Sequence, residues 1–216
     1  ELCISELVKL HASFWNNIEE VAWLPHIANS ENASNMAAGA RVGWDQMMQI
    51  FGDKVPTALN EQREAYLDRI DSLQQQLDVA PITFVHGDFR LDNMLFGQLP
   101  DHHPLVVVDF QGPLKGKGIQ DVAYLLSHSA QTAVRREHEK RLVRYYVDGL
   151  VAAGVEGYDF DEAWQDYRIA VLYCWTVAVV IAGTMDPDNE RGYAWMSKMV
   201  ERNGAAIEDL GCLELL

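Results

Sequence analysis

The chain has 216 residues, of which 49% are hydrophobic and 23% charged, so it can bury a core as one soluble domain or at most two small ones. Its net charge of −15 leaves no stripe of Lys and Arg to neutralise phosphates. This argues against a nucleic-acid partner and favours a solvated acidic surface over the attraction of a cationic substrate. The three cysteines, Cys3, Cys174 and Cys212, are an odd number at wide spacing. They indicate neither a disulfide framework nor a metal site, and a reducing, cytoplasmic setting fits them best.

Residues 1–22 are predicted to form an amphipathic helix, because apolar side chains recur there at helical spacing. No basic stretch leads into an apolar one, so the segment is not a secretory signal peptide. The chain opens with Glu1 rather than Met, and we therefore expect it to be a piece of a longer protein. The apolar face of the predicted helix consists of Leu2, Leu7, Leu10, Phe14 and Ile18.

The next segments are predicted to alternate between loop and helix. Residues 23–43 are rich in Asn, Ser, Ala and Gly and are expected to be loop with at most a short helix. One helix is expected over 44–51 and a second over 57–78, with Thr57 as its N-cap. The inward face of this second helix is predicted to be Leu59, Tyr66, Ile70, Leu73 and Leu77.

The hydrophobic period becomes strand-like between residues 82 and 110. The segments ITFVHGD, NMLFG and PLVVVDF are predicted strands, and the loop GQLPDHHP joins the last two into a hairpin. His102 and His103 in this loop lack further metal-ligand spacing and are expected to be solvated. The segment LKGKG (114–118) lacks the Walker pattern and is expected to be a flexible link.

From Asp121 onward the pattern is helical, with breaks at GVEGYD and TMDPD. The apolar stretch 169–183 is short for a bilayer span of about 20 residues. It is predicted to be a buried core helix, so no membrane partner is expected. The whole chain, residues 1–216, is predicted to be one domain of α+β class, mainly α, with a small central β-hairpin. The C-terminal helices are expected at 121–130, 134–152, 160–182 and 189–209, with Trp164, Tyr167, Tyr173 and Trp175 mostly in the core.

Polar side chains gather around the predicted hairpin. Asp88 leaves the first strand, Asn93 follows five residues later, and Asp109 ends the hairpin. This Asp-x-x-x-x-Asn spacing, followed by a hairpin and Asp-Phe, is the catalytic arrangement of the protein-kinase fold. There one carboxylate accepts or orients the proton of the attacking hydroxyl, while an amide oxygen and a second carboxylate hold Mg²⁺ at the phosphates. The spacing therefore predicts phosphoryl transfer.

Longer stretches of the sequence carry a family resemblance. VHGDFRLDNMLF followed by VVVDFQGPLKGKGIQDVAYLL resembles the aminoglycoside phosphotransferase and choline kinase superfamily, and within it the ecdysteroid-kinase-like branch. ELVKLHASFW resembles the helix that follows the hinge in these enzymes, and DFDEAWQDYRIAVLYCW a helix of their C-terminal lobe. The resemblance implies a kinase-like C-terminal lobe. It also implies an enzyme that uses ATP and Mg²⁺ to phosphorylate a hydroxyl of a small molecule, with an aminoglycoside-, choline- or steroid-like acceptor.

Two departures from protein kinases favour a small-molecule kinase. Position 87 is Gly, where a protein kinase has the Arg that reads a phosphorylated activation loop. Only eleven residues separate Asp109 from Asp121, too few for that loop and a peptide platform. The acceptor is therefore expected to be a small molecule.

One departure from the superfamily concerns the nucleotide. No Gly-rich loop, Val-Ala-x-Lys strand or partner Glu helix precedes residue 1, so the resemblance implies that the N-terminal ATP-binding lobe is absent from this chain. We expect the chain alone to transfer phosphate poorly or not at all. We also expect self-association through the apolar surface where that lobe would dock.

The three central residues have both a chemical and a structural interpretation. Asp88 is expected to be catalytic rather than a turn cap, Asn93 to bind metal rather than to form an Asx turn, and Asp109 to bind metal rather than merely to end a strand. The alternative function is a non-catalytic binding or scaffold domain that keeps the kinase fold. The presence of all three residues argues against this non-catalytic alternative.

The neighbouring polar residues are expected to support the loop. His86 is expected to position it through hydrogen bonds rather than to act as a base. Asp121 caps a helix, and by resemblance it also braces the catalytic loop. Arg90 is left open between a contact to phosphate or substrate and a pair with Asp92 or another acid.

Overall fold

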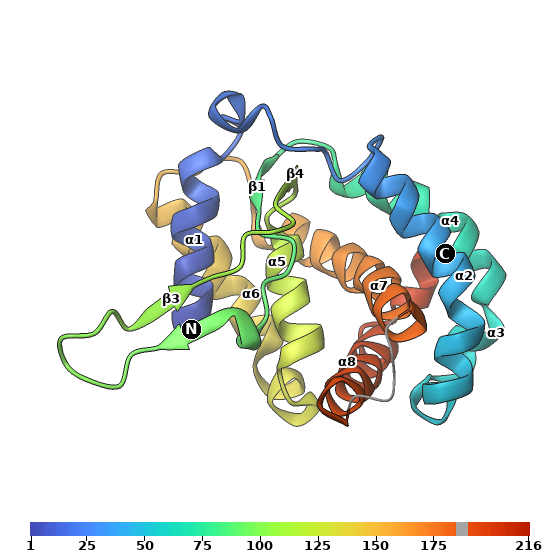
Figure 1. Cartoon of the computed structure of the whole chain (residues 1–216). Coiled ribbons are helices and arrows are strands. Elements are labelled where there is room, and N and C mark those ends of the chain that lie inside the picture. The colour runs from blue at the N-terminus through green and yellow to red at the C-terminus, as the bar shows by residue number, and fades with distance from the viewer. Residues whose placement is uncertain (185–189) are drawn as a thin grey trace.

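The computed structural model describes residues 1–184 and 190–216, and most of them are helical (Figure 1). The predicted class, mainly α with a small β component, is confirmed. The α-helices are α1 (Leu2–Phe14), α2 (Glu31–Phe51), α3 (Thr57–Glu61), α4 (Arg63–Leu77), α5 (Ile119–Tyr124), α6 (Thr132–Ala152), α7 (Phe160–Thr184) and α8 (Glu190–Asp209). The strands are β1 (Thr83–Val85), β2 (Met94–Phe96), β3 (Leu105–Val107) and β4 (Leu114–Gly116). Short helical turns lie at η1 (Glu19–Val21), η2 (Gly52–Lys54), η3 (Leu91–Asn93), η4 (Leu125–Ser129, a π-helical turn) and η5 (Cys212–Leu215).

Helix α7 is the central element of the helical body, and α2, α4, α5, α6 and α8 all contact it. By length and composition α7 could cross a membrane, but 67% of its apolar window is buried against the rest of the chain. The prediction of a buried core helix is confirmed. Tyr167, Tyr173 and Trp175 are buried along it as predicted, and Trp164 packs at the edge of the core.

Helix α2 corrects the predicted loop over 23–43. It begins at Glu31, after the Ser30 side chain accepts a hydrogen bond from the Ala33 N–H at 3.1 Å. The small residues that suggested a loop instead let α2 approach α7 closely. A Cβ at Gly43 would lie 3.0 Å from the Val179 carbonyl oxygen, and one at Gly183 would overlap the Gly43 carbonyl. Glycine here serves packing, which local sequence cannot distinguish from loop composition.

The first predicted helix is shorter in the structure, since α1 ends at Phe14 instead of reaching residue 22. Asn16 adopts a left-handed φ of 53° and pairs with Ile82, donating its N–H at 2.8 Å and accepting from the Ile82 N–H at 3.0 Å. These two bonds tie the end of α1 to the chain entering β1. Leu2 on the predicted apolar face is exposed, and the fully buried residues of α1 are Ile4, Leu7 and His11.

The predicted helix over 57–78 is divided into α3 and α4 at Gln62. Thr57 is the first helical residue and not the cap, because Pro56 stands at the N-cap position. The predicted inward face is confirmed, since Leu59, Tyr66, Ile70, Leu73 and Leu77 are all fully buried.

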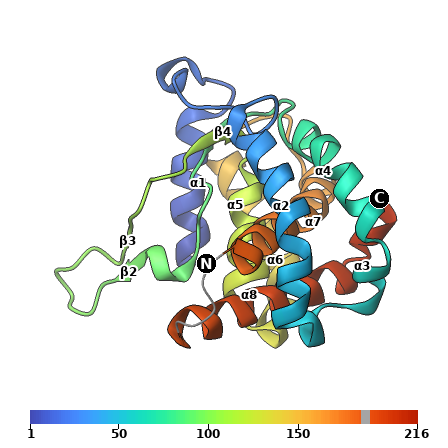
Figure 2. The same ribbon diagram turned by 45° about the vertical axis from the view of Figure 1, so that its right-hand side comes forward.

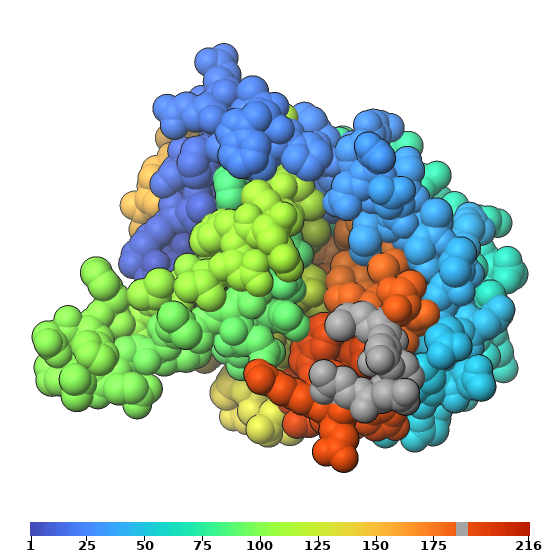
Figure 3. Space-filling model, in the orientation of Figure 1, coloured from blue at the N-terminus to red at the C-terminus, as the bar shows by residue number. Residues whose placement is uncertain are grey.

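The strands form two separate antiparallel pairs. The predicted β2–β3 hairpin is confirmed, with Met94 opposite Val107 and Phe96 opposite Leu105. It projects from the helical body in both ribbon views and in the space-filling view (Figures 2 and 3). The flexible link predicted at 114–118 is wrong, because its first three residues form β4, buried and paired with β1. The Lys117 ammonium is also fixed, 2.7 Å from the Asp166 carboxylate.

The C-terminal helices agree with their predicted positions within a few residues, except that 121–130 divides into α5 and η4. The break at GVEGYD is confirmed and contains two glycines with positive φ, Gly154 at 93° and Gly157 at 76°. The second break, and the predicted first residue of the last helix, fall mainly on residues 185–189, outside the described residues.

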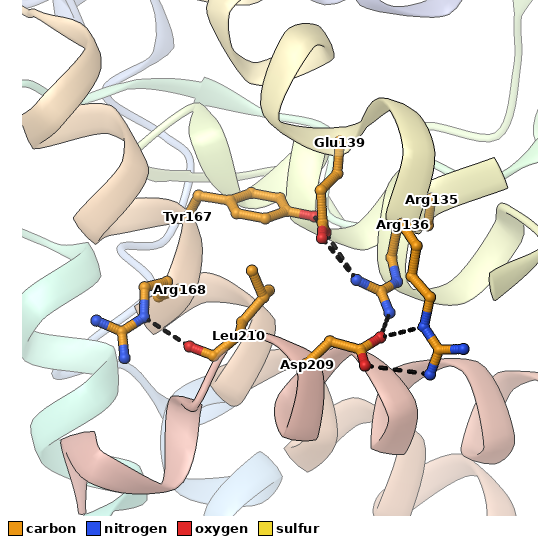
Figure 4. Close-up of polar contacts among 7 residues, drawn as sticks. All are labelled: Arg135, Arg136, Glu139, Tyr167, Arg168, Asp209 and Leu210. Atoms are coloured by element: carbon orange, nitrogen blue, oxygen red, sulfur yellow. Dashed lines mark hydrogen bonds and ion pairs between the residues drawn. The ribbon is translucent and has the colours of Figure 1, made fainter. Parts of the chain in front are cut away.

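A buried ionic network joins α6, α7 and α8 (Figure 4). The Arg135 guanidinium, 1% exposed, donates to both Glu139 oxygens at 2.8 Å and also to Asp209. Arg136 donates to Asp209 at 2.8 Å, and the Tyr167 hydroxyl donates to Glu139 at 3.2 Å. Because each carboxylate has several donors, the network offsets the cost of burying its charges and fixes the C-terminal half of α8.

Candidate active site

A sharp turn at His86, Gly87 and Asp88 follows β1 directly. Gly87 has a φ of 82°, and a Cβ there would stand 2.5 Å from the Gly112 carbonyl oxygen, so both conformation and space demand glycine. The buried Asp121 carboxylate, from the first turn of α5, accepts the His86 N–H at 2.7 Å and the Gly87 N–H at 3.0 Å. The turn is therefore fastened to α5, in agreement with the bracing role expected of Asp121.

Asp121 has a second partner that sequence reasoning missed. His11 of α1 donates from Nε2 to Asp121 Oδ2 at 3.2 Å, and its Nδ1 lies 2.7 Å from the Tyr146 hydroxyl of α6. A Cβ at Gly118 would lie 2.6 Å from His11 Nδ1 and from that hydroxyl, so glycine makes room for the contact. A histidine on the buried face of the first helix was the available signal.

The His86 ring is used entirely in backbone hydrogen bonds. Its Nε2 lies 3.2 Å from the Val108 carbonyl oxygen and its Nδ1 accepts the Asp88 N–H at 3.2 Å. The carbonyl can only accept, so Nε2 carries the proton and the ring is the neutral tautomer. Because neither nitrogen is available to take up a proton, the geometry supports a positioning role for His86 and not that of a base.

The Asn93 amide grips Asp88. Its Nδ2 donates to the Asp88 backbone oxygen at 2.9 Å and to Asp88 Oδ2 at 2.8 Å. No described residue donates to Asn93 Oδ1, so that oxygen has a lone pair available to a ligand. Arg90 pairs with Asp88 and not with Asp92, since its Nε lies 3.3 Å from Asp88 Oδ1 while its guanidinium stacks 4.4 Å from the Trp195 ring centre.

Asp109 reaches the same end of the hairpin through its neighbour. The Val108 N–H donates to the Asn93 carbonyl oxygen at 3.0 Å, which holds the residue before Asp109 against Asn93. Asp109 itself has a φ of 66°, in the left-handed region that non-glycine residues rarely adopt, and its side chain is exposed. Backbone strain of this kind concentrates at functional sites.

Tyr124, at the end of α5, is a further site residue that the sequence did not reveal. It is 2% exposed, and its pKa is raised well above the ordinary value, first by burial and then by the neighbouring Asp88 carboxylate. The neutral hydroxyl is thus a hydrogen-bond donor beside Asp88. Nothing in the sequence distinguishes Tyr124 from the other buried aromatics of the helices.

The donor set fits a hard divalent cation held mainly by phosphates. Asn93 Oδ1 and the Asp109 carboxylate are oxygen ligands, the type that Mg²⁺ prefers. In the described part of the chain no group of three or more His, Cys, Asp or Glu side chains could hold a metal ion by itself. Mg²⁺ commonly takes only one or two protein ligands and completes its shell with water and substrate phosphates.

A family comparison agrees with this geometry. The model of the ecdysteroid kinase-like family matches residues 2–154, which include every site residue described above except Trp195. The chain belongs to the ecdysteroid kinase-like family. The resemblance and the kinase-like fold predicted from the sequence are therefore confirmed, while α7 and α8 lie beyond the matched part. No curated protein matches the chain.

Proposed function

We propose that this ecdysteroid kinase-like chain carries the catalytic half of an enzyme that transfers the γ-phosphate of ATP to a hydroxyl of a small molecule. The observation that carries the proposal is the grip of Asn93 on Asp88, with Asp109 held at the same end of the hairpin. A kinase-like fold places a proton acceptor and two metal ligands in this relation.

Asp88 orients the acceptor hydroxyl and accepts its proton as the bond to phosphorus forms. Three neighbours prepare the carboxylate for this task. Asn93 fixes its Oδ2, the Arg90 guanidinium lies beside its Oδ1, and the Tyr124 hydroxyl stands next to it. With the side chain held in one rotamer, little ordering remains to be done when the acceptor binds.

Asn93 Oδ1 and the Asp109 carboxylate would hold the metal. Mg²⁺, bound there with ATP, supplies the positive charge that offsets the charge developing on the transferred phosphoryl group. The chain's own contribution is position, because β2, β3 and the Val108–Asn93 hydrogen bond set the spacing of the two ligands.

A small-molecule acceptor is favoured over a peptide. The eleven residues between Asp109 and Asp121 form β4 and lead directly into α5, so this segment forms no activation loop. A steroid-, choline- or aminoglycoside-like alcohol remains the proposed acceptor class. We further propose a cytoplasmic setting, consistent with three free cysteines, and an N-terminal lobe in the complete enzyme that holds the adenine and phosphates.

The test is Asp88→Asn in the full-length enzyme, which keeps the size of the side chain and leaves one oxygen to accept the hydrogen bond from Asn93. Loss of the proton acceptor is expected to lower kcat about 10²–10⁴-fold while the unfolding temperature stays unchanged. Asp148→Asn, an exposed carboxylate on α6, is the matched control and is expected to retain wild-type kcat. Wild-type turnover in Asp88→Asn would contradict the proposal.

A further inference from the structure

A cavity of about 750 Å³ opens beside the catalytic turn, enclosed by α1, η3, η4, α6 and α8. Its volume lies in the range of ligand sites of globular proteins, about 300–1,000 Å³. We call it the α8 cavity. Its apolar wall is formed by Ile4, Leu91, Leu125, Leu126, Val134 and Leu142.

One stripe of α8 supplies a second part of the lining. Arg191, Trp195, Lys198 and Arg202 recur at helical spacing and all line the cavity. Three cations thus meet in one pocket of a chain whose net charge is −15, against two acids at the same lining, Glu1 and Asp92. The α8 part of the lining therefore carries positive charge, at Lys198 and Arg202 in particular.

Lys198 is the cation available to a ligand. It is exposed, and among residues 1–184 and 190–216 no carboxylate forms an ion pair with it. Arg202 is partly engaged, because its Nη1 donates to the backbone oxygens of His128 at 3.2 Å and Ser129 at 2.8 Å. The positive charge of Lys198 therefore indicates that the ligand is an anion.

His128 adds a buried polar group to the lining. It is 6% exposed, and its ring nitrogens are shielded from solvent beside the Asn203 side chain and the Cys174 backbone, which serve as its hydrogen-bond partners. Burial, the largest cause, lowers its pKa to about 3, so the ring is neutral and offers one donor and one acceptor. The neutral ring therefore adds no charge to the lining, and the charged side chains of α8 set its electrostatic character.

The cavity also reaches the segment that follows the catalytic turn. Leu91 lines it, and the Leu91 N–H donates to the Ser129 side chain at 3.2 Å. Trp195 lines it as well. The Arg90 guanidinium, which pairs with Asp88, lies over the Trp195 ring. A molecule in the cavity therefore lies against the residues that hold the proton acceptor.

We propose that the α8 cavity binds the acceptor and that this acceptor is an amphipathic anion: an apolar body with a hydroxyl and a carboxylate-like group that pairs with Lys198. The inference rests on the proposed kinase function and deepens it. A cationic acceptor would be repelled by Lys198, and only Asp92 of the lining could offset this because Glu1 already pairs with Arg141. A neutral acceptor would leave Lys198 without an ionic partner among the described residues.

Titration calorimetry of the 216-residue chain, without nucleotide, tests the charge requirement. Three probes share a twelve-carbon apolar body with a terminal hydroxyl and differ only at the other end: ω-hydroxydodecanoate, dodecanediol and ω-aminododecanol. We expect the carboxylate to bind about five- to tenfold more tightly than the diol, and the amine most weakly. The preference should shrink as salt is raised, because the pair is partly exposed.

Two variants and a control locate the effect. Lys198→Gln is expected to remove the preference for the carboxylate. Lys140→Gln on α6 should keep it, because the Lys140 ammonium lies away from the cavity, 5.8 Å from the ring centre of Trp164. Ala194→Trp, at an exposed position of α8 that lines the cavity, should weaken all three probes together by filling the space.

Equal affinities for the three probes, no measurable binding of any of them, or a preference that survives Lys198→Gln would each overturn the inference. Unchanged binding in Ala194→Trp would overturn it too, because the probes would then bind elsewhere. None of these outcomes involves phosphoryl transfer. Failure of the kinase proposal would instead appear as wild-type turnover in Asp88→Asn, with the charge preference intact.

Discussion

Asn93 serves the site with both ends of one amide. Its Nδ2 holds Asp88 in place while its Oδ1 receives no hydrogen bond from the described residues. An aspartate could bind metal as well but has no N–H to donate, so the amide suits a residue that must hold a carboxylate and bind a cation together. In the proposed mechanism Asp109 only binds the cation, because its side chain makes no hydrogen bond with the described residues.

This difference predicts distinct effects of two alanine variants in the full-length enzyme. Asp109→Ala should raise the Mg²⁺ concentration for half-maximal activity more than Asn93→Ala does, because a carboxylate brings a full charge and an amide only a dipole. Asn93→Ala should also lower kcat at saturating Mg²⁺, because Asp88 loses its clamp. Activity measured against Mg²⁺ concentration separates the two effects. An unchanged Mg²⁺ requirement in Asp109→Ala would refute its role as a ligand.

At the residue scale the spacing predicted Asp88, Asn93 and Asp109, and the family resemblance added Asp121. Asp88, Asn93 and Asp109 lie on one turn and one hairpin, so their proximity follows from local structure. His11 meets Asp121 across 110 positions and Tyr146 across 135, through helix packing that no local pattern encodes. His11 and Tyr146, which act only through tertiary contacts, could therefore not be predicted from the sequence.

At the element scale, the same small residues can indicate a loop or a close helix contact. The Ala, Gly, Ser and Asn content of residues 31–43 indicates a loop, yet these residues form most of α2. Whether these residues form a loop or a packed helix depends on Gly183 of α7. This glycine lies against the Gly43 backbone, although it is about 140 positions away in the sequence. Strand β4 was not predicted for a related reason: it pairs with β1, which lies on the other side of the catalytic turn in the sequence.

Gly183→Ala should therefore destabilise the protein although alanine is the better helix former. The gain in helix propensity is about 1 kcal/mol, but the new Cβ overlaps the Gly43 carbonyl, and separating two packed helices costs about 1–3 kcal/mol or more. Urea unfolding should show a lower midpoint with an unchanged slope. Gly52→Ala is the control, since its Cβ would meet only the flexible end of Met48 at 3.2 Å. A Gly183→Ala variant as stable as the parent would show that α2 and α7 are not in backbone contact.

At the scale of the whole molecule, the proposed function uses the described residues as one wall of a nucleotide cleft. They supply the catalytic turn and the metal ligands on the β2–β3 side, but the sequence contains no Gly-rich loop to close over the phosphates. Large apolar side chains remain exposed on and beside the hairpin: Leu95 (60%), Phe96 (44%), Val106 (42%) and Phe110 (47%). An apolar surface of this kind favours contact with a further lobe or with a second copy of the chain.

The 216-residue chain should therefore bind ATP·Mg only weakly. A nucleotide on a single wall keeps much of its solvent exposure, so the freedom lost on binding is poorly offset by contacts. We expect a millimolar Kd, equivalent to about −4 kcal/mol, and a still weaker one without Mg²⁺ because the phosphates then face Asp88 and Asp109 unshielded. Titration calorimetry with ATP, with and without Mg²⁺, measures both values. The Asp109→Ala variant should lose the Mg²⁺ effect while the Asp148→Asn control keeps it. Micromolar binding by this chain would contradict the prediction and would mean that its own residues enclose the nucleotide.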